Sequence, residues 1–166
     1  MRDLNALAGF EKSGHFFFNA PIGRGYDDGF VTAIAVLDVL DRNPRKTMAD
    51  LYRELPSTWG SPTMSPHCVD EAKYEVVDRV MARINTMQKK GEKLASQSIR
   101  DIVIVNGIRL IIADGTWGLV RASSNKPELV VVFESPVSEA RMREMFKAID
   151  DVLRENPEVG EYNQTI

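Results

Sequence analysis

Residues 121–126 bring together the side chains that proteins use to hold a phosphate group. Arg121 carries a guanidinium, and two hydroxyls and an amide follow it on Ser123, Ser124 and Asn125. A guanidinium matches phosphate oxygens with two parallel hydrogen bonds, and hydroxyl and amide groups add neutral donors. The segment therefore predicts an anion-binding loop. The alternative is ordinary turn chemistry, because serine, asparagine and proline favour turns for local backbone reasons.

A second group of polar residues lies near the start of the chain. Glu11, Ser13 and His15 occupy alternate positions, so they share one face if the segment is a strand. If the chain turns there, Gly14 helps to present them on a loop. A carboxylate, a hydroxyl and an imidazole can hydrogen-bond sugar hydroxyls, and His15 can also transfer a proton near neutral pH. The polar face of an edge strand is the other interpretation.

The segments around Arg121 and its neighbouring polar residues have the sequence pattern of an antiparallel sheet. Four apolar runs predict strands, at residues 102–105, 108–112, 116–120 and 129–133. Asn106-Gly107 and Asp114-Gly115 lie between the first three runs, and both are strong hairpin signals. The loop at 121–126 then joins the third run to the fourth.

Helical patterns flank these strands. The segment from Asp70 to about Gln88 places a set of apolar residues on one face: Tyr74, Val77, Val80, Met81, Ile84 and Met87. A second stripe, from Met142 to Leu153, follows Ser138, which is a predicted N-cap. We therefore expect an α+β fold, with a four-stranded antiparallel sheet and helices on one face.

The N-terminal third has a different organisation. An apolar run at 5–10 precedes two amphipathic helices, one opened at Asp27 and Asp28 and ending near Asn43, the other running from Thr47 to Pro56. A change to Ser, Thr, Gly and Pro then marks a boundary. We expect a more complete unit after this boundary, and a mobile tail at 158–166.

Composition excludes several classes of function. The chain has 166 residues and a net charge of −3, so it has no basic character that would suit a nucleic acid partner. No apolar stretch is long enough for a membrane span, and a single cysteine permits no internal disulfide. His67 and Cys68 are adjacent, without a second pair at ligand spacing, so no metal site is expected. We expect a cytoplasmic setting.

Several motifs, taken in order along the chain, resemble the C-terminal part of the α-D-phosphohexomutases, in particular bacterial phosphomannomutase/phosphoglucomutase. They are Glu-Lys-Ser-Gly-His-Phe-Phe at 11–17, Asp-Asp-Gly at 27–29, Asn-Gly-Ile-Arg at 106–109, and Asp-Gly-Thr-Trp-Gly-Leu-Val-Arg-Ala-Ser at 114–123, with Pro127. The resemblance implies an incomplete α/β remnant of the sugar-recognition domain at 1–58 and a linker at 59–66. The TBP-like fourth domain of these enzymes, which binds phosphate, is then expected at 67–157.

The resemblance also implies roles for individual residues. It places Glu11 and Ser13 on sugar hydroxyls and His15 as a general acid/base. It places the loop residues on the phosphate that is not reacting: Arg121, Ser123, Ser124 and Asn125. Phe10 stands where the family usually has glycine. The segment at 124–126 also departs from the family pattern, which leaves open whether Ser124 or Asn125 contacts phosphate.

By this resemblance, the whole enzyme interconverts hexose 1-phosphate and 6-phosphate through a phosphoserine and a hexose 1,6-bisphosphate, with Mg²⁺. The sequence has no Ser-His-Asn-Pro-like phosphoserine loop and no Asp-Gly-Asp-Gly-Asp metal loop. We therefore expect a C-terminal fragment that is inactive alone, needs the N-terminal domains as partners, binds hexose phosphate, and self-associates through exposed apolar faces. A phosphoglucosamine mutase fragment and a non-catalytic sugar-phosphate binding module are the alternatives.

Overall fold

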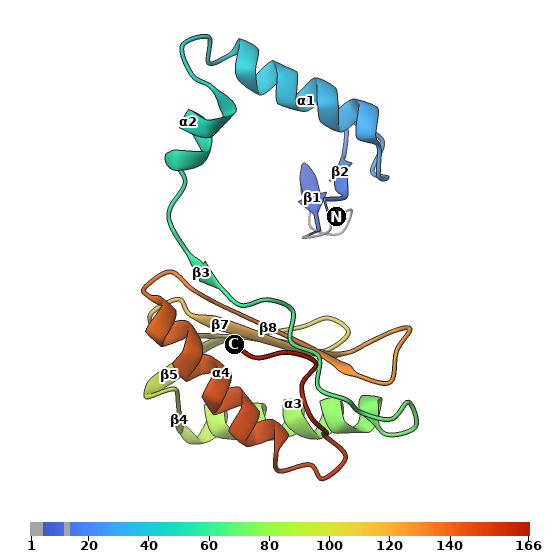
Figure 1. Cartoon of the computed structure of the whole chain (residues 1–166), viewed down its shortest axis with the longest axis vertical. Helices are drawn as coiled ribbons and strands as arrows, with labels where there is room; N and C mark the ends of the chain where they lie inside the picture. Colours follow the sequence, from blue (N-terminus) through green and yellow to red (C-terminus); the bar gives the residue numbers. More distant parts are fainter. Residues whose placement is uncertain (1–4, 12–13) are drawn as a thin grey trace. The chain divides into compact units, whose positions relative to one another are not determined.

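The computed structural model describes residues 5–11 and 14–166. The chain divides into two compact units, Met1–Pro56 and Ser57–Ile166 (Figure 1). Each unit is built from its own elements and is described separately below.

The described residues of the first unit form one short hairpin and two helices. Strands β1 (Ala8–Phe10) and β2 (Phe16–Phe18) pair antiparallel, with Gly9 opposite Phe17. Helices α1 (Gly29–Asp41) and α2 (Met48–Arg53) follow, as the sequence predicted.

The side chains expected at the two helix starts do form the caps. The Asp28 carboxylate accepts hydrogen bonds from the N–H groups of Phe30 and Val31. Thr47 forms a reciprocal capping box with Asp50. Capping satisfies N–H groups that have no partner within the helix, so it fixes where each helix begins.

The apolar stripes of these helices remain exposed. Neither α1 nor α2 has a buried residue, and Phe30, Ile34 and Leu37 of α1 are 86%, 66% and 63% exposed. Two strands of three residues are too small to cover a thirteen-residue helix. The described part of this unit therefore leaves the apolar side chains of α1 exposed.

The second unit is built on one antiparallel sheet. Its strands, in spatial order, are β3 (Trp59–Gly60), β8 (Leu129–Ser135), β7 (Trp117–Ala122), β6 (Ile108–Ile112), β5 (Gln97–Ile104) and β4 (Lys93–Leu94). The prediction of four strands is wrong because β3 and β4 were missed. Each has only two residues, so neither can show the alternation that identifies a strand in a sequence.

Two helices cover one face of this sheet, as predicted. Figure 1 shows α3 (Lys73–Lys90) and α4 (Glu139–Leu153) on the same side. Ser138 caps α4 by accepting from the N–H of Arg141, as expected. Burial alternates strictly along β6 and β8, so every second residue points toward the helices.

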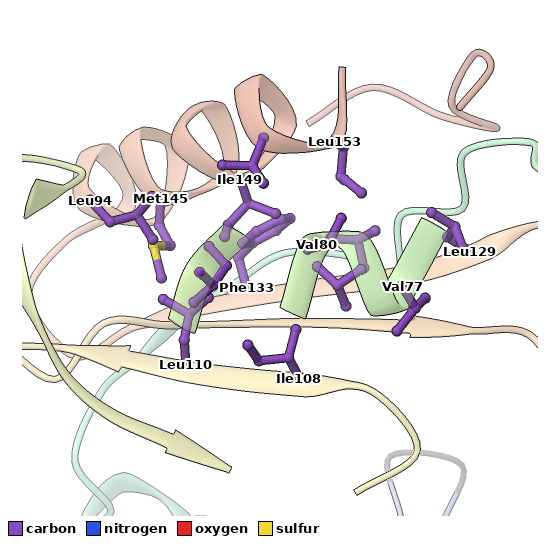
Figure 2. Close-up of a cluster of buried hydrophobic side chains, with 14 of the residues drawn as sticks. Val77, Val80, Leu94, Ile108, Leu110, Leu129, Phe133, Met145, Ile149 and Leu153 are labelled. Atoms are coloured by element: carbon purple, nitrogen blue, oxygen red, sulfur yellow. The ribbon is translucent and has the colours of Figure 1, made fainter. Parts of the chain in front are cut away.

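The core fills the layer between the helices and the sheet (Figure 2). Ile108, Leu110 and Phe133 of the sheet meet Val80 of α3 and Ile149 of α4 there, and all five are almost completely buried. One predicted core residue is misplaced: Tyr74 is 60% exposed, and Val76 takes its place on the buried face of α3. The helical period is right, but the buried stripe is rotated away from Tyr74.

The C-terminal segment 158–166, predicted to be mobile, makes several contacts with this core. The Tyr162 hydroxyl donates to Asp150 Oδ1 at 2.9 Å, and its ring lies 5.4 Å from that of Phe146. Pro66 forms an isolated bridge with Tyr162, and Val159 is buried. These contacts favour an ordered end to the unit.

Candidate functional site

The β7–β8 loop has a shape fixed by its own hydrogen bonds. The strand ladder ends where Ala122 pairs with Leu129. Beyond it, the N–H of Ser123 donates to the carbonyl of Glu128 at 3.0 Å, and the N–H of Glu128 donates to the carbonyl of Lys126 at 2.9 Å. The loop therefore closes as a compact turn that presents the intervening residues at one end of the sheet.

The polar side chains of this loop differ in exposure. Ser123 is only 4% exposed, and its hydroxyl donates to Asn125 Oδ1 at 3.2 Å. Ser124 and Asn125 are exposed. The Ser123 hydroxyl therefore helps to shape the loop, whereas Ser124 and Asn125 can meet a ligand directly.

Arg121 lies at the wall of a cleft beside this loop. Its Nη1 donates to the carbonyl of Ala122 at 3.1 Å, which leaves further guanidinium N–H groups for a ligand. The cleft has a volume of about 710 Å³ and is lined by the loop, the β5–β6 turn at 104–107 and the first half of α3. Ser124 lines the same cleft. One cation and one hydroxyl from the predicted group therefore face a common space.

Gly107 supports the backbone of Arg121. The sequence predicted a hairpin turn at Asn106-Gly107, and the structure has that turn between β5 and β6. Gly107 has φ +144°, and a Cβ atom there would lie 2.4 Å from the Val120 carbonyl oxygen and 2.6 Å from Arg121 Cβ. Only glycine fits without displacing Arg121. Sequence spacing gives no sign of this contact, which joins two different hairpins.

Glu11 and His15 lie on a turn rather than on a strand face. The N–H of Glu11 donates to the carbonyl of His15 at 3.0 Å, the N–H of Gly14 donates to the carbonyl of Glu11 at 3.0 Å, and Gly14 has φ +88°. For Glu11 and His15 the strand interpretation is therefore wrong, and the chain turns at Gly14 instead. Ser13 lies outside the described residues.

Asp27 is a residue of this site that the sequence reasoning missed. Its Oδ2 lies 2.6 Å from Nδ1 of His15, and its Oδ1 accepts a hydrogen bond from the N–H of Phe16 at 3.3 Å. This hydrogen bond, together with the negative charge of Asp27, raises the pKa of His15 above its usual value of 6.5. The signal was the pair Asp27-Asp28: one aspartate is enough to cap α1, and the structure uses Asp28, so Asp27 is available for another partner.

The part of the chain that the structure describes contains neither a candidate metal site nor a candidate membrane-spanning helix. Residues 5–11 and 14–166 contain no cluster of three or more histidine, cysteine, aspartate or glutamate side chains that could hold a metal ion. Cys68 is fully buried, and burial raises the pKa of its thiol, which makes it a poor nucleophile or ligand. Within the same ranges, no helix combines the length and hydropathy needed to cross a bilayer.

Comparison with protein families gives two matches that follow one another along the chain. Residues 1–59 match the phosphoglucomutase/phosphomannomutase alpha/beta/alpha domain III, and residues 68–152 match the phosphoglucomutase/phosphomannomutase C-terminal domain. The second match contains the cleft, Gly107 and Arg121, and the first contains the turn with His15 and Asp27.

Curated relatives extend over most of the chain at moderate identity. A phosphomannomutase/phosphoglucomutase of Pseudomonas putida is 28% identical over 96% of the chain, and a phosphoglucomutase of Neisseria meningitidis is 28% identical over 95%. A phosphopentomutase of Thermococcus kodakarensis is 32% identical over 72%. The chain spans only 31%, 31% and 24% of the lengths of these three relatives.

A solved structure shares the fold. The crystal structure of a phosphoglucomutase/phosphomannomutase family protein from Burkholderia thailandensis aligns with a TM-score of 0.71 at 24% identity, and it covers 96% of this chain and 30% of that one. The two successive domain matches show the family: the chain belongs to the phosphoglucomutase/phosphomannomutase family and comprises its domain III and C-terminal domain segments.

Proposed function

We propose that this chain contributes phosphate binding and sugar recognition to a phosphohexomutase that interconverts hexose 1-phosphate and hexose 6-phosphate. The observation that carries the proposal is the position of Arg121, whose guanidinium shares a cleft with Ser124 beside a loop of exposed polar side chains. A guanidinium with neighbouring neutral donors suits a phosphate dianion.

In this proposal the loop binds the phosphate that is not reacting. Arg121 supplies the charge-assisted hydrogen bonds, and Ser124 and Asn125 add neutral donors from their exposed positions. Ser123 acts through the loop, because its buried hydroxyl bonds Asn125. Since the substrate must bind from either end during isomerisation, a set of separate donors suits the task better than a rigid fit to one ester.

The turn of the first unit recognises the sugar and moves a proton. Glu11 and Ser13 accept or donate hydrogen bonds to sugar hydroxyls. When Asp27 accepts a hydrogen bond from Nδ1–H of His15, the Nε2 atom is left to exchange a proton with a reacting hydroxyl. A raised pKa keeps a larger fraction of His15 protonated at neutral pH, which suits the general-acid step.

The transfer itself is assigned to a longer protein that contains this chain's two segments. There, a phosphoserine donates its phosphoryl group to the free hydroxyl, the resulting bisphosphorylated sugar turns over, and the other phosphoryl group returns to the serine. Mg²⁺ would neutralise charge on the transferring group, but the described residues here hold no cluster that fits it. We therefore expect no mutase turnover from the purified chain alone, and measurable turnover would contradict this assignment.

Mapping of hexose phosphate binding by NMR tests the proposal. Titration of the ¹⁵N-labelled chain with glucose, mannose and glucosamine 6-phosphates should shift the amide signals of residues 121–125 and of the facing turn at 104–107. The strongest ligand would identify the preferred sugar. Shifts scattered over the surface, or none in this loop, would contradict phosphate binding there.

A further inference from the structure

Lys73 places a buried ammonium group directly behind the β7–β8 loop. Its side chain is only 5% exposed, although lysine is normally a surface residue. Its Nζ donates to Asp70 Oδ1 at 2.7 Å and to the carbonyl oxygen of Lys126 at 3.0 Å. Lys73 therefore connects the first turn of α3 to a loop that lies 53 residues further along the chain.

The two hydrogen-bond partners of Lys73 have different consequences. A buried ammonium is costly unless it is paired and hydrogen-bonded, and Asp70 supplies the opposite charge. Asp70 lies three residues before Lys73 in the chain and is 62% exposed. The ion pair is therefore local and does not position any distant part of the chain. The bond to Lys126 is different, because it fixes backbone in the loop that carries Ser124 and Asn125.

The carbonyl of Lys126 accepts two hydrogen bonds within the structure of the loop. It accepts from the N–H of Glu128 at 2.9 Å as well as from Lys73. Next to it, the carbonyl of Pro127 accepts from the N–H of Cys68 at 3.0 Å. The segment before α3 and its first turn therefore hold one side of the loop, and the bonds made by Ser123 shape the loop from within.

We propose that Lys73 is a positioning residue that keeps the β7–β8 loop in the shape that accepts a phosphate. The part of this inference that concerns the ligand rests on the proposed function. Lys73 does not itself reach the cleft, whose lining includes Arg121 and Ser124. It acts through the Lys126 carbonyl and hence through the position of the exposed loop residues.

Amide hydrogen exchange of the ligand-free chain tests the inference. Lys73→Met keeps an unbranched apolar stem and removes the ammonium. It should speed exchange at Ser123 and Glu128 by about tenfold or more, because a hydrogen bond to a charged group is lost. The core strand amide of Leu110 should change by less than about threefold if the loop loosens locally.

Three further variants separate loop positioning from general stability. Lys73→Arg retains a charged donor and should restore most of the loop protection. Asp70→Asn removes the charge paired with Lys73 but leaves the Lys126 contact in place, so any loss of protection should not be confined to the loop. Lys89→Met makes the same chemical change at an exposed position of the same helix and should have no effect. If Lys73→Met does not fold, Lys73→Leu, which also removes the donor, replaces it with the same expected loop-specific effect.

Glucose 6-phosphate binding provides the second measurement. Lys73→Met should weaken binding by about fivefold to tenfold, less than loss of Arg121 itself, because the donors remain but are less well placed. The inference is overturned if Lys73→Met leaves the amide protection of the loop unchanged, or if its loop and core amides lose protection equally. It is also overturned if the loop amides of Lys73→Arg exchange as fast as those of Lys73→Met. A wild-type chain that binds no hexose phosphate would contradict the proposed function, while the exchange data alone would still decide the role of Lys73.

Discussion

Nδ1 of His15 and Oδ2 of Asp27 lie 2.6 Å apart, although the residues are twelve positions apart in the sequence. The contact ties the β1–β2 turn to the residue that immediately precedes the cap of α1. The contact gives His15 a carboxylate partner and orients its ring. The predictions below begin from this pair.

Asp27→Asn should lower the pKa of His15 toward its usual value of 6.5, because the amide keeps a polar contact but removes the negative charge. Asp28→Asn is the matched control, since it changes the neighbouring carboxylate to another good N-cap and leaves the His15 partner in place. NMR titration of the His15 ring signals measures both. Equal pKa values in the wild type and Asp27→Asn would contradict the pairing.

The same pair predicts the sign of a pH effect on stability. The pKa of His15 is raised in the folded state, so folding favours the protonated ring. The stabilisation is fully present below the unfolded pKa of about 6.5 and is lost as the pH rises through the folded value. Both side chains are substantially exposed, so the effect should be small and should weaken in salt. Urea denaturation at several pH values, compared with Asp27→Asn, measures it.

Gly107→Ala should destabilise the second unit by about 2–4 kcal/mol, since backbone strain adds to overpacking against Val120 and Arg121. Gly91→Ala is the control. Gly91 also has a positive φ, +68°, but a Cβ there meets nothing within 4 Å, so a cost of about 1 kcal/mol is expected. Denaturant unfolding compares the two variants. Equal losses would show that the close approach to Arg121 is not the cause.

The end of the chain should be ordered and should contribute to stability. Tyr162→Phe removes only the hydrogen bond to Asp150 and should cost about 0.5–1.5 kcal/mol. Tyr162→Ala also removes the ring contacts with Phe146 and Arg154 and should cost about 2–3 kcal/mol. Thermal unfolding measures the difference. Wild-type stability in Tyr162→Ala would support a mobile segment at 158–166 instead.

The exposed apolar face of α1 should drive self-association of the purified chain. Changing Phe30, Ile34 and Leu37 together to glutamine keeps good helix formers and removes the apolar surface. Sedimentation velocity over a concentration series should show association of the wild type and much less of the triple variant. Val69→Gln with Val137→Gln, at exposed apolar positions of the second unit, should behave like the wild type. A wild type that remains monomeric would contradict the prediction.

Much of the fold could be predicted because local patterns and tertiary packing agree. The caps at Thr47 and Ser138 and the turns at Asn106-Gly107 and Asp114-Gly115 occur where residue chemistry places them. The two-residue strands β3 and β4 could not be found, because strands that short are defined by their partners and not by their own pattern.

The candidate site divides in the same way. Arg121 and the loop polar residues are recognisable from residue type, since they are contiguous. The contacts that hold these residues in place are not recognisable from the sequence. Gly107 lies 14 residues before its partner Arg121, and Lys73 lies 53 residues before its partner Lys126. A single sequence carries no signal of such packing, and the same holds for the contact of Asp27 with His15.

The central claim is that Arg121 anchors a sugar phosphate, and calorimetric titration with glucose 6-phosphate tests it most directly. Arg121→Met keeps most of the aliphatic stem and removes the guanidinium. It should weaken binding by at least about tenfold, because a charge-assisted contact is lost. Arg100→Met, at an exposed position on β5, should bind like the wild type. Equal affinity of Arg121→Met and the wild type, or equal loss in both variants, would contradict the claim.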